Sequence, residues 1–376
     1  MNTKSRFFYL PDAYNPYGTS YNFGVDVSGN RDGATELQMG NPLVSWEKAG
    51  KQNYGLDFSI LDEHLSGSFD YFIEKRHDIL TTRNTAPNFI AITMPVVNIG
   101  KVDNKGFELV LKWNHSIGDF KYWINGNLSY AKNKIVYKDE IPHKYPWLYE
   151  TGQSVGQPFG FIFDGFVTEA DLESGKLPDH KLDLKPGDAK YKDLNGDGTI
   201  NDFDKRAIGK PNLPTTTLGW TIGGSWKGFS ISVLFQGSFD YSFAINGTGI
   251  ESGKSQFQPL HQKRWTQERY ENGESIEFPR LTMQDGTINS ASAYNSDFWL
   301  INAWYIRLKT VDLGYQLPKT ALPKFLDNVR FYVNAYNLLT FTGYDKYQQD
   351  PEIKTNTAGD AYMNQRVINF GVQLGF

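Results

Sequence analysis

The chain has 376 residues, with 38 basic and 42 acidic side chains and a formal net charge of −4. No segment approaches the roughly 18 consecutive apolar residues of a membrane helix, which excludes a helical membrane protein. Cysteine is absent and no basic run occurs, which excludes disulfide scaffolds, cysteine nucleophiles and a nucleic-acid interface. The 36 glycines and 15% aromatic residues are typical of an all-β protein.

Period-2 alternation of apolar and polar residues predicts about nine β-strands. In chain order they are expected near residues 53–60, 64–75, 104–114, 119–131, 214–226, 228–238, 303–317, 327–340 and 365–376. Most of them match the roughly 9–11 residues that a tilted strand needs to cross a bilayer. In the seventh strand the alternation shifts by one residue between Leu308 and Val311. This shift predicts a β-bulge.

The expected connections alternate between short and long. Short links are expected at Leu61–Glu63, His115–Gly118, Trp226–Phe229 and Pro318–Asp327, and long loops at 76–103, 132–213, 239–302 and 341–364. Short turns at one end and long loops at the other are the layout of an outer-membrane barrel. Aromatic residues at the ends of the apolar faces favour the same fold. We therefore predict an antiparallel transmembrane β-barrel with long extracellular loops.

Two alternatives stay open at this point. A secreted soluble β-sandwich that binds glycans would have the same amphipathic strands, because its apolar face would form a core. A self-contained small porin would need an even number of strands that closes on itself. Nine strands is an odd number, so we expect that upstream strands are missing, although a strand near Arg6–Leu10 would make the number even. No signal peptide is recognised at the first residues.

The segment from Asp193 to Asp204 fits a calcium-loop pattern. Oxygen ligands are expected from Asp193, Asn195, Asp197, the backbone carbonyl of Thr199, and Asp204 in place of the usual glutamate. Ca²⁺ prefers six to eight oxygen ligands, which explains the alternation of Asp and Asn. We expect a structural Ca²⁺ within the long loop 132–213. The alternative is a turn rich in Asp and Asn that holds no metal.

No catalytic arrangement is evident, so the chain is not expected to be an enzyme. The six histidines lack metal-ligand spacing, and neither a nucleophile elbow nor a phosphate-binding glycine loop occurs. Aromatic loop residues are candidates for contacting a ligand; they are Trp147, Tyr149, Trp265 and Trp299. The competing interpretation is that most of these side chains pack the loops against each other.

Several segments in order along the chain resemble the C-terminal part of the SusC/RagA family of TonB-dependent outer-membrane transporters. They include NPLVSWEKAGKQNYGLDF at 41–58, VNIGKVDNKGFELVLKW at 97–113, GQSVGQPFGFIFDGF at 152–166, the DLNGDG loop, and YIRLKTVDLGYQLPK at 305–319. The resemblance implies about nine or ten C-terminal strands of a 22-stranded barrel over residues 1–376. On this resemblance, we expect the plug domain and the signal peptide of the family to be absent from the chain.

The resemblance also implies a function. It is TonB-dependent import, across the outer membrane of a Gram-negative bacterium, of a nutrient too large for porins, with a glycan favoured over an oligopeptide. The implied partners are a SusD-like surface lipoprotein, the TonB complex through the missing N-terminal region, and outer-membrane lipid. The terminal strand resembles the barrel-assembly signal, with Phe370, Val372, Leu374 and Phe376 on one face.

Overall fold

The computed structural model describes residues 13–23, 29–38, 40–85, 94–245, 259–282, 288–291, 293–343, 345–347, 350–353 and 362–376. The chain divides into two compact units. The first comprises residues 1–53, 72–105 and 132–155, and the second comprises residues 54–71, 106–131 and 156–376.

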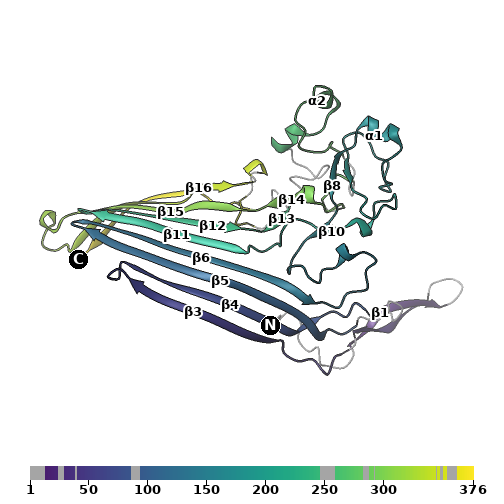
Figure 1. Cartoon of the computed structure of the whole chain (residues 1–376), viewed down its shortest axis with the longest axis horizontal. Coiled ribbons are helices and arrows are strands. Elements are labelled where there is room, and N and C mark those ends of the chain that lie inside the picture. Colours follow the sequence, from purple (N-terminus) through teal and green to yellow (C-terminus); the bar gives the residue numbers. More distant parts are fainter. Residues whose placement is uncertain are drawn as a thin grey trace. The chain divides into compact units, whose positions relative to one another are not determined.

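One nine-stranded sheet contains all nine strands that the sequence predicts. They are β3 (Lys48–Ile60), β4 (Leu65–Thr81), β5 (Val97–Ile117), β6 (Phe120–Tyr137), β11 (Thr216–Trp226), β12 (Phe229–Phe239), β15 (Tyr305–Gln316), β16 (Asn328–Thr342) and β17 (Val367–Gly375). Their order in the sheet is β17-β16-β15-β12-β11-β6-β5-β4-β3, so strands that follow each other in this set are neighbours (Figure 1). The strands from β6 to β17 pair antiparallel.

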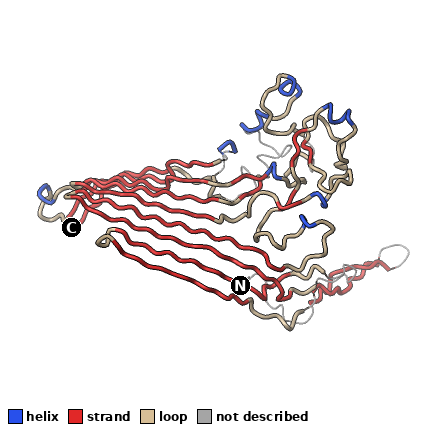
Figure 2. Tube along the Cα trace, viewed as in Figure 1, coloured by secondary structure: helices blue, strands red, loops and turns tan. Residues whose placement is uncertain are grey.

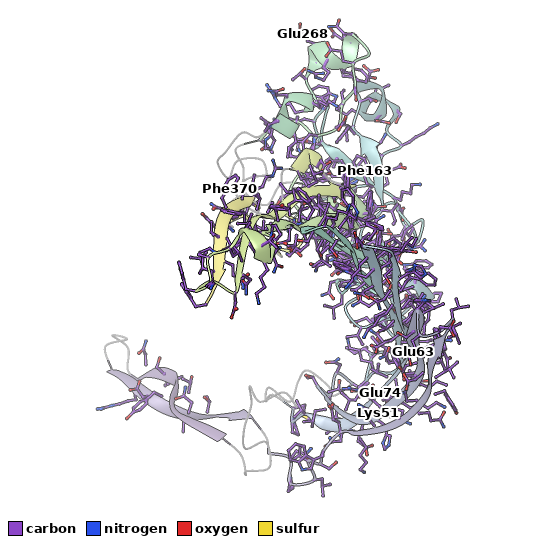
Figure 3. The ribbon with its side chains drawn as sticks, turned by 90° about the vertical axis from the view of Figure 1, so that its left-hand side faces the viewer. Lys51, Glu63, Glu74, Phe163, Glu268 and Phe370 are labelled. Carbon is purple, nitrogen blue, oxygen red and sulfur yellow. The ribbon has the colours of Figure 1, made fainter. Side chains whose placement is uncertain are left out.

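Strands β4, β5 and β6 are longer than predicted. Residues 76–81 and 97–103 of the predicted loop 76–103 belong to β4 and β5, and residues 132–137 of the predicted loop 132–213 belong to β6. Their additional residues are mostly polar, and they lack the apolar alternation that marks a strand in the sequence. The backbone ladder does not require apolar side chains, and ion pairs join β3 to β4 within the first unit. The Lys51 ammonium lies 3.9 Å from the Glu74 carboxylate (Figure 3), and Lys48 lies 3.0 Å from Asp78.

The short links are tight turns whose backbone conformations explain their length. The β11–β12 hairpin turns through Lys227 (φ 44°) and Gly228 (φ 88°), the left-handed pair that matches strand twist in a two-residue turn. Between β3 and β4, Leu61, Asp62 and Glu63 all have positive φ. In Figure 2 the turns of the second unit gather at one end of its strands, as the alternation of connection lengths predicts.

The predicted bulge in β15 is confirmed. Leu234 of β12 pairs with Thr310, and the next residue, Phe235, pairs with Leu308, so that Lys309 is the extra residue. On the other side of β15 the register with β16 shifts at the same point.

The apolar face of the sheet in the second unit is exposed. Ile222 of β11 is 44% exposed, Phe229 of β12 is 58% exposed and Phe370 of β17 is 80% exposed. A soluble sandwich would bury these side chains against a second sheet. The exposed face does not fit that alternative, and it fits a barrel whose apolar face meets lipid.

The remaining described elements lie outside the sheet. They are the strands β1 (Ala13–Phe23), β2 (Gly29–Gln38), β7 (Phe159–Gly160), β8 (Phe163–Phe166), β9 (Ala189–Tyr191), β10 (Arg206–Ala207), β13 (Ser242–Ala244) and β14 (Leu300–Asn302), the helices α1 (Glu169–Ser174) and α2 (Gln267–Glu271), and the 3-10 turns η2 (Pro146–Leu148), η3 (Asp202–Asp204), η4 (Pro259–Lys263), η5 (Asp297–Trp299), η6 (Lys319–Ala321) and η7 (Asp345–Tyr347). The β1–β2 hairpin was not predicted, and the suggested strand near Arg6–Leu10 lies outside the described residues. Within the described ranges, no helix has both the length and the apolar character to span a membrane.

The hydrophobic core lies in the long loops of the second unit. One cluster consists of Tyr241, Ile245, Phe278, Ala291, Trp299, Ile301 and Ala303, and a second consists of Phe161, Ala189, Tyr191, Ile200 and Ile288. Each cluster combines residues that are far apart in sequence. The loops therefore form a folded structure of their own.

Candidate functional site on the long loops

Two long loops of the second unit, residues 156–215 before β11 and residues 240–304 before β15, bind each other through their backbones. The Phe161 N–H donates to the Asn295 carbonyl at 2.9 Å, and the Asp297 N–H donates to the Phe161 carbonyl at 3.1 Å. The Asp297 carboxylate also accepts the N–H of Phe163, a residue of β8, at 2.7 Å. These bonds hold the two loops together as one folded surface beyond the sheet.

A buried charge network joins the same two loops. The Asp188 carboxylate is 2% exposed, and it accepts hydrogen bonds from Arg280 Nε at 2.5 Å and Arg280 Nη2 at 3.1 Å. Asn289 Nδ2 donates to the same carboxylate at 2.7 Å, and the Lys185 N–H donates at 2.8 Å. Sequence analysis missed this network. Its partners lie about 100 residues apart, and no local motif marks them.

His180 is buried in its loop as a neutral imidazole. Its Nδ1 lies 2.7 Å from the Pro178 carbonyl oxygen, and its Nε2 accepts the Tyr191 N–H at 3.2 Å. This pair of contacts requires the proton on Nδ1. Burial lowers the pKa of His180, although the Pro178 carbonyl and Asp179 act in the opposite direction. Burial also raises the pKa of Tyr191, whose hydroxyl donates to the Ile288 carbonyl.

A polar cavity of about 400 Å³ lies beside α1 and β9. It is lined by Asp164, Asp171, Ser174, Lys176, Leu177, Pro178, Lys190, Tyr191, Lys192 and Asp193. The Lys190 ammonium lies 2.7 Å from the Asp171 carboxylate, which also accepts two bonds from Thr168 in the capping box of α1. Burial would raise the pKa of Asp171, but hydrogen bonds from Lys190 and Thr168 lower it. The Asp171 carboxylate in the cavity wall is therefore ionised and is held in place by Lys190 and Thr168.

The predicted calcium loop is a turn closed by its own carboxylates. Asp193 accepts the N–H groups of Gly196 and Gly198, each at 2.7 Å. The fully buried Asp204 accepts the N–H groups of Leu194 at 2.8 Å and Asn201 at 2.9 Å. Asn195 and Asp197 are joined through Asn195 Nδ2 at 3.0 Å, so their side chains converge.

Whether the 193–204 turn can hold a metal ion depends on the oxygen donors that its residues offer. Among the described residues, no group of three or more His, Cys, Asp or Glu side chains is placed to hold a metal ion. The calcium pattern also uses an amide, that of Asn195, and a carbonyl, that of Thr199, which such a group does not include. These oxygen donors fit a hard cation, and the calcium site stays a prediction.

The four candidate aromatic residues divide between two environments. Trp147 belongs to η2 in the first unit and is half-buried, with its ring stacked 4.6 Å from that of Tyr145. Tyr149, in the same unit, accepts the His143 N–H at 3.0 Å through its hydroxyl. Both residues are therefore held by neighbours in their own loop.

The other two aromatic candidates pack inside the second unit. Trp299 is 2% exposed within the first loop cluster, with the Phe278 and Phe298 rings at its edges, so it is a core residue and no ligand can reach it in this structure. Trp265 packs on Gly187, where a side-chain carbon would come within 2.4 Å of the indole.

The terminal strand has the predicted alternation. Phe370, Val372 and Leu374 of β17, together with Phe376, are exposed on the apolar face, from 51% for Leu374 to 81% for Phe376. Part of this face lines an apolar cavity of about 890 Å³ with Trp226 and Phe229 at its other end. The structure does not test the role of this strand as an assembly signal, which stays a prediction.

Comparisons with known proteins agree with this fold. A family model described as "TonB dependent receptor-like, beta-barrel" matches residues 5–338. TonB-dependent receptor P3 of Formosa agariphila is 27% identical over 374 residues, which cover 92% of this chain and 36% of that protein. TonB-dependent receptor SusC of Bacteroides thetaiotaomicron is 24% identical, over 89% of this chain and 32% of that protein.

Solved structures of the RagAB peptide importer have the same fold. The closed-closed state superposes with a TM-score of 0.69 and the open-open state with 0.68, both at 23% identity. The alignments cover 97% and 95% of this chain, but only 38% and 37% of the solved chains. The chain thus spans about a third of the length of these relatives, between 32% and 38%. It belongs to the TonB-dependent receptor β-barrel family.

Proposed function

We propose that this chain forms part of the barrel wall of a TonB-dependent importer in the outer membrane of a Gram-negative bacterium. The observation that carries the proposal is the nine-stranded antiparallel sheet with one exposed apolar face, in a chain of this family. In a bilayer that face would meet lipid and the opposite face would line the lumen. The cargo would be a nutrient too large for porins, moved without chemical change.

The polar face of the sheet supports a role as the wall of a passage. On this face of β11 the side chains are small throughout; they are Thr217, Gly219, Thr221, Gly223 and Ser225. Two larger side chains on the polar face of the sheet contact glycines of neighbouring strands. The Trp123 ring covers Gly223 and the Tyr332 ring covers Gly371, where an added side-chain carbon would lie 2.2 Å and 2.3 Å from the rings.

A fractionation experiment tests the proposed location. The full-length protein should be recovered with outer membranes and require detergent for extraction. Recovery in the soluble fraction without detergent would contradict the proposal. Deleting the TonB-contacting region should leave the protein in the membrane but abolish uptake, because energy enters through that region in this proposal.

For the cargo, we propose a glycan, captured together with a SusD-like surface lipoprotein. Support comes from the stacked rings of Trp147 and Tyr145, because aromatic rings can stack on the apolar faces of sugar rings. An oligopeptide is the second candidate, because RagAB, whose fold this chain shares, is a peptide importer. Purifying the complex from native cells, and identifying the released ligand by mass spectrometry, separates the two. Peptides without oligosaccharides would overturn the glycan proposal.

We also propose that Ca²⁺ binds the 193–204 turn and stabilises its loop. The metal would be held by Asp193, Asn195, Asp197, the Thr199 carbonyl and Asp204. Added Ca²⁺ should slow proteolysis of the 186–214 segment, and Asp197→Ala should remove that protection. Equal cleavage in Ca²⁺ and in chelator would contradict this site.

A further inference from the structure

An arginine is buried on the polar face of the sheet where β15 leaves the long loops. Arg307 is 2% exposed, and all three of its guanidinium nitrogens have partners. Nε donates to the Thr340 hydroxyl at 2.9 Å, Nη2 lies 2.9 Å from the Asp350 carboxylate, and Nη1 lies 2.5 Å from the Glu352 carboxylate. A buried guanidinium is tolerated only when it is paired and hydrogen-bonded in this way.

Both carboxylates come from the loop between β16 and β17. Glu352 also accepts from the Lys309 ammonium at 2.8 Å, the Tyr305 hydroxyl at 3.3 Å and Asn364 Nδ2 at 3.0 Å. The Pro351 carbonyl accepts the Tyr241 hydroxyl at 3.3 Å. The described loop residues 350–353 are therefore fastened to β15 and to the loop that precedes it.

The β-bulge contributes to this arrangement. Lys309 is the extra residue of the bulge, and its side chain reaches the same carboxylate as Arg307. Bulges commonly redirect a side chain in this way. The cluster contains two positive and two negative side chains, so it is electrically balanced only while residues 350–353 stay in place.

We propose that residues 350–353 act as a releasable latch over the polar face of β15, closed by Arg307 and Lys309 and opened when the four charges become hydrated. The inference rests on the proposed function, in which this face lines the passage. Closed, the latch covers Arg307. Open, it would present a guanidinium and an ammonium to the lumen. Because each buried ion depends on its partners, the latch should be held by the complete set and released when the acidic side is neutralised.

Cysteine accessibility tests the latch, because the 376 residues contain no cysteine. The reporter is Ile353→Cys in the full-length protein, and the probe is a membrane-impermeant maleimide. Combining the reporter with D350N and E352Q should raise the labelling rate at least about tenfold, since the buried Arg307 and the partly exposed Lys309 then lose their counter-ions. The matched control is K263Q, which removes the exposed Lys263–Glu277 pair and should leave the rate unchanged.

Three outcomes decide the question. Labelling of the double variant at the wild-type rate would overturn the latch. The latch proposal would also fail if Ile353→Cys, with Asp350 and Glu352 unchanged, reacted as fast as Tyr362→Cys, whose position is 80% exposed. A disulfide between Lys309→Cys and Glu352→Cys that suppresses labelling at Ile353→Cys until it is reduced would support it. The comparison can be made on detergent-purified protein, so it stays interpretable even if fractionation contradicts the proposed outer-membrane function.

Discussion

In the second unit, the sheet exposes its apolar side chains, whereas the loops bury theirs. Trp220, on the apolar face of β11, is 53% exposed, whereas Trp299, in the loop cluster, is 2% exposed. Both residues are tryptophans in well-ordered elements, so residue type does not explain the difference. The loops carry a core of their own, as a water-soluble structure must, whereas the sheet leaves its apolar face to the surrounding medium. The two regions are built for different solvents.

The comparison is tested most strongly by truncating the two tryptophans. Trp299→Ala should destabilise the loop structure by roughly 3–5 kcal/mol, because it removes a buried aromatic side chain from a packed cluster. Trp220→Ala should cost much less, since its ring is not packed in a core. The measurement is the rate of loop proteolysis in the purified protein. Equal effects of the two substitutions would contradict the assignment of Trp299 to a core.

The medium around the sheet is tested by a charge on the apolar face. Ile222→Arg should cost roughly 2–4 kcal/mol if β11 crosses a bilayer with Ile222 near the midplane. In water the same substitution at a 44% exposed position should be nearly neutral. The readout is the yield of heat-modifiable, folded protein in outer membranes. Thr221→Arg, on the opposite face, is the matched control, and an equal loss of folded protein in the two variants would remove the argument for lipid contact.

Acidification should weaken the loops before it affects the sheet. His180 is held neutral and its pKa is lowered by burial, so the unfolded loop binds a proton more readily than the folded loop. Stability is then complete above the unfolded value of about 6.5 and is lost as pH falls from there toward the lower folded value. Hydrogen exchange of 178–191, followed from pH 7.5 to pH 5, measures this loss. His180→Gln should flatten the pH dependence, and an unchanged profile would exclude His180 as its cause.

A smaller effect is expected at the start of α1. The Thr168 hydroxyl accepts the Asp171 N–H at 3.1 Å, and the Asp171 carboxylate accepts the Thr168 N–H at 2.9 Å. Thr168→Ala should therefore cost about 1 kcal/mol of local stability. Thr168→Ser keeps the cap and serves as the control. Local hydrogen exchange of 168–175 reports the change, which should not spread to β11 or β12.

The sheet could be predicted from the sequence because its signals are local. Alternation with a period of two residues identifies each strand, and the phase shift places the bulge between Leu308 and Val311, where the structure shows Lys309 as the extra residue. The polar extensions of β4 and β5 and the β1–β2 hairpin could not be found in this way. Their side chains do not alternate, and only backbone pairing defines them.

The loops could not be predicted, because their structure rests on contacts between distant residues. Asp188 and Arg280 are 92 positions apart, and neither lies in a recognisable motif. Trp299 could be identified as a loop aromatic, but only the fold shows that it is buried. Arg307 and Lys309 are two basic residues within the strand pattern of β15, and they were a sequence signal for a charge cluster at this strand.

The bulge at Lys309 divides β15 into two parts that differ in which residues face the polar side of the sheet. Before it, odd-numbered residues such as Tyr305 and Arg307 share the polar face; after it, even-numbered residues such as Asp312 do so. Deletion of Lys309 would therefore leave Leu308 and Thr310 as consecutive residues that keep their present partners in β12, Phe235 and Leu234, and each face of β15 would keep its side chains. Deletion of a residue elsewhere in β15 would shift the pairing by one position and exchange the two faces over part of the strand. The strand should therefore tolerate the loss of one residue at the bulge, and not at its regularly paired positions.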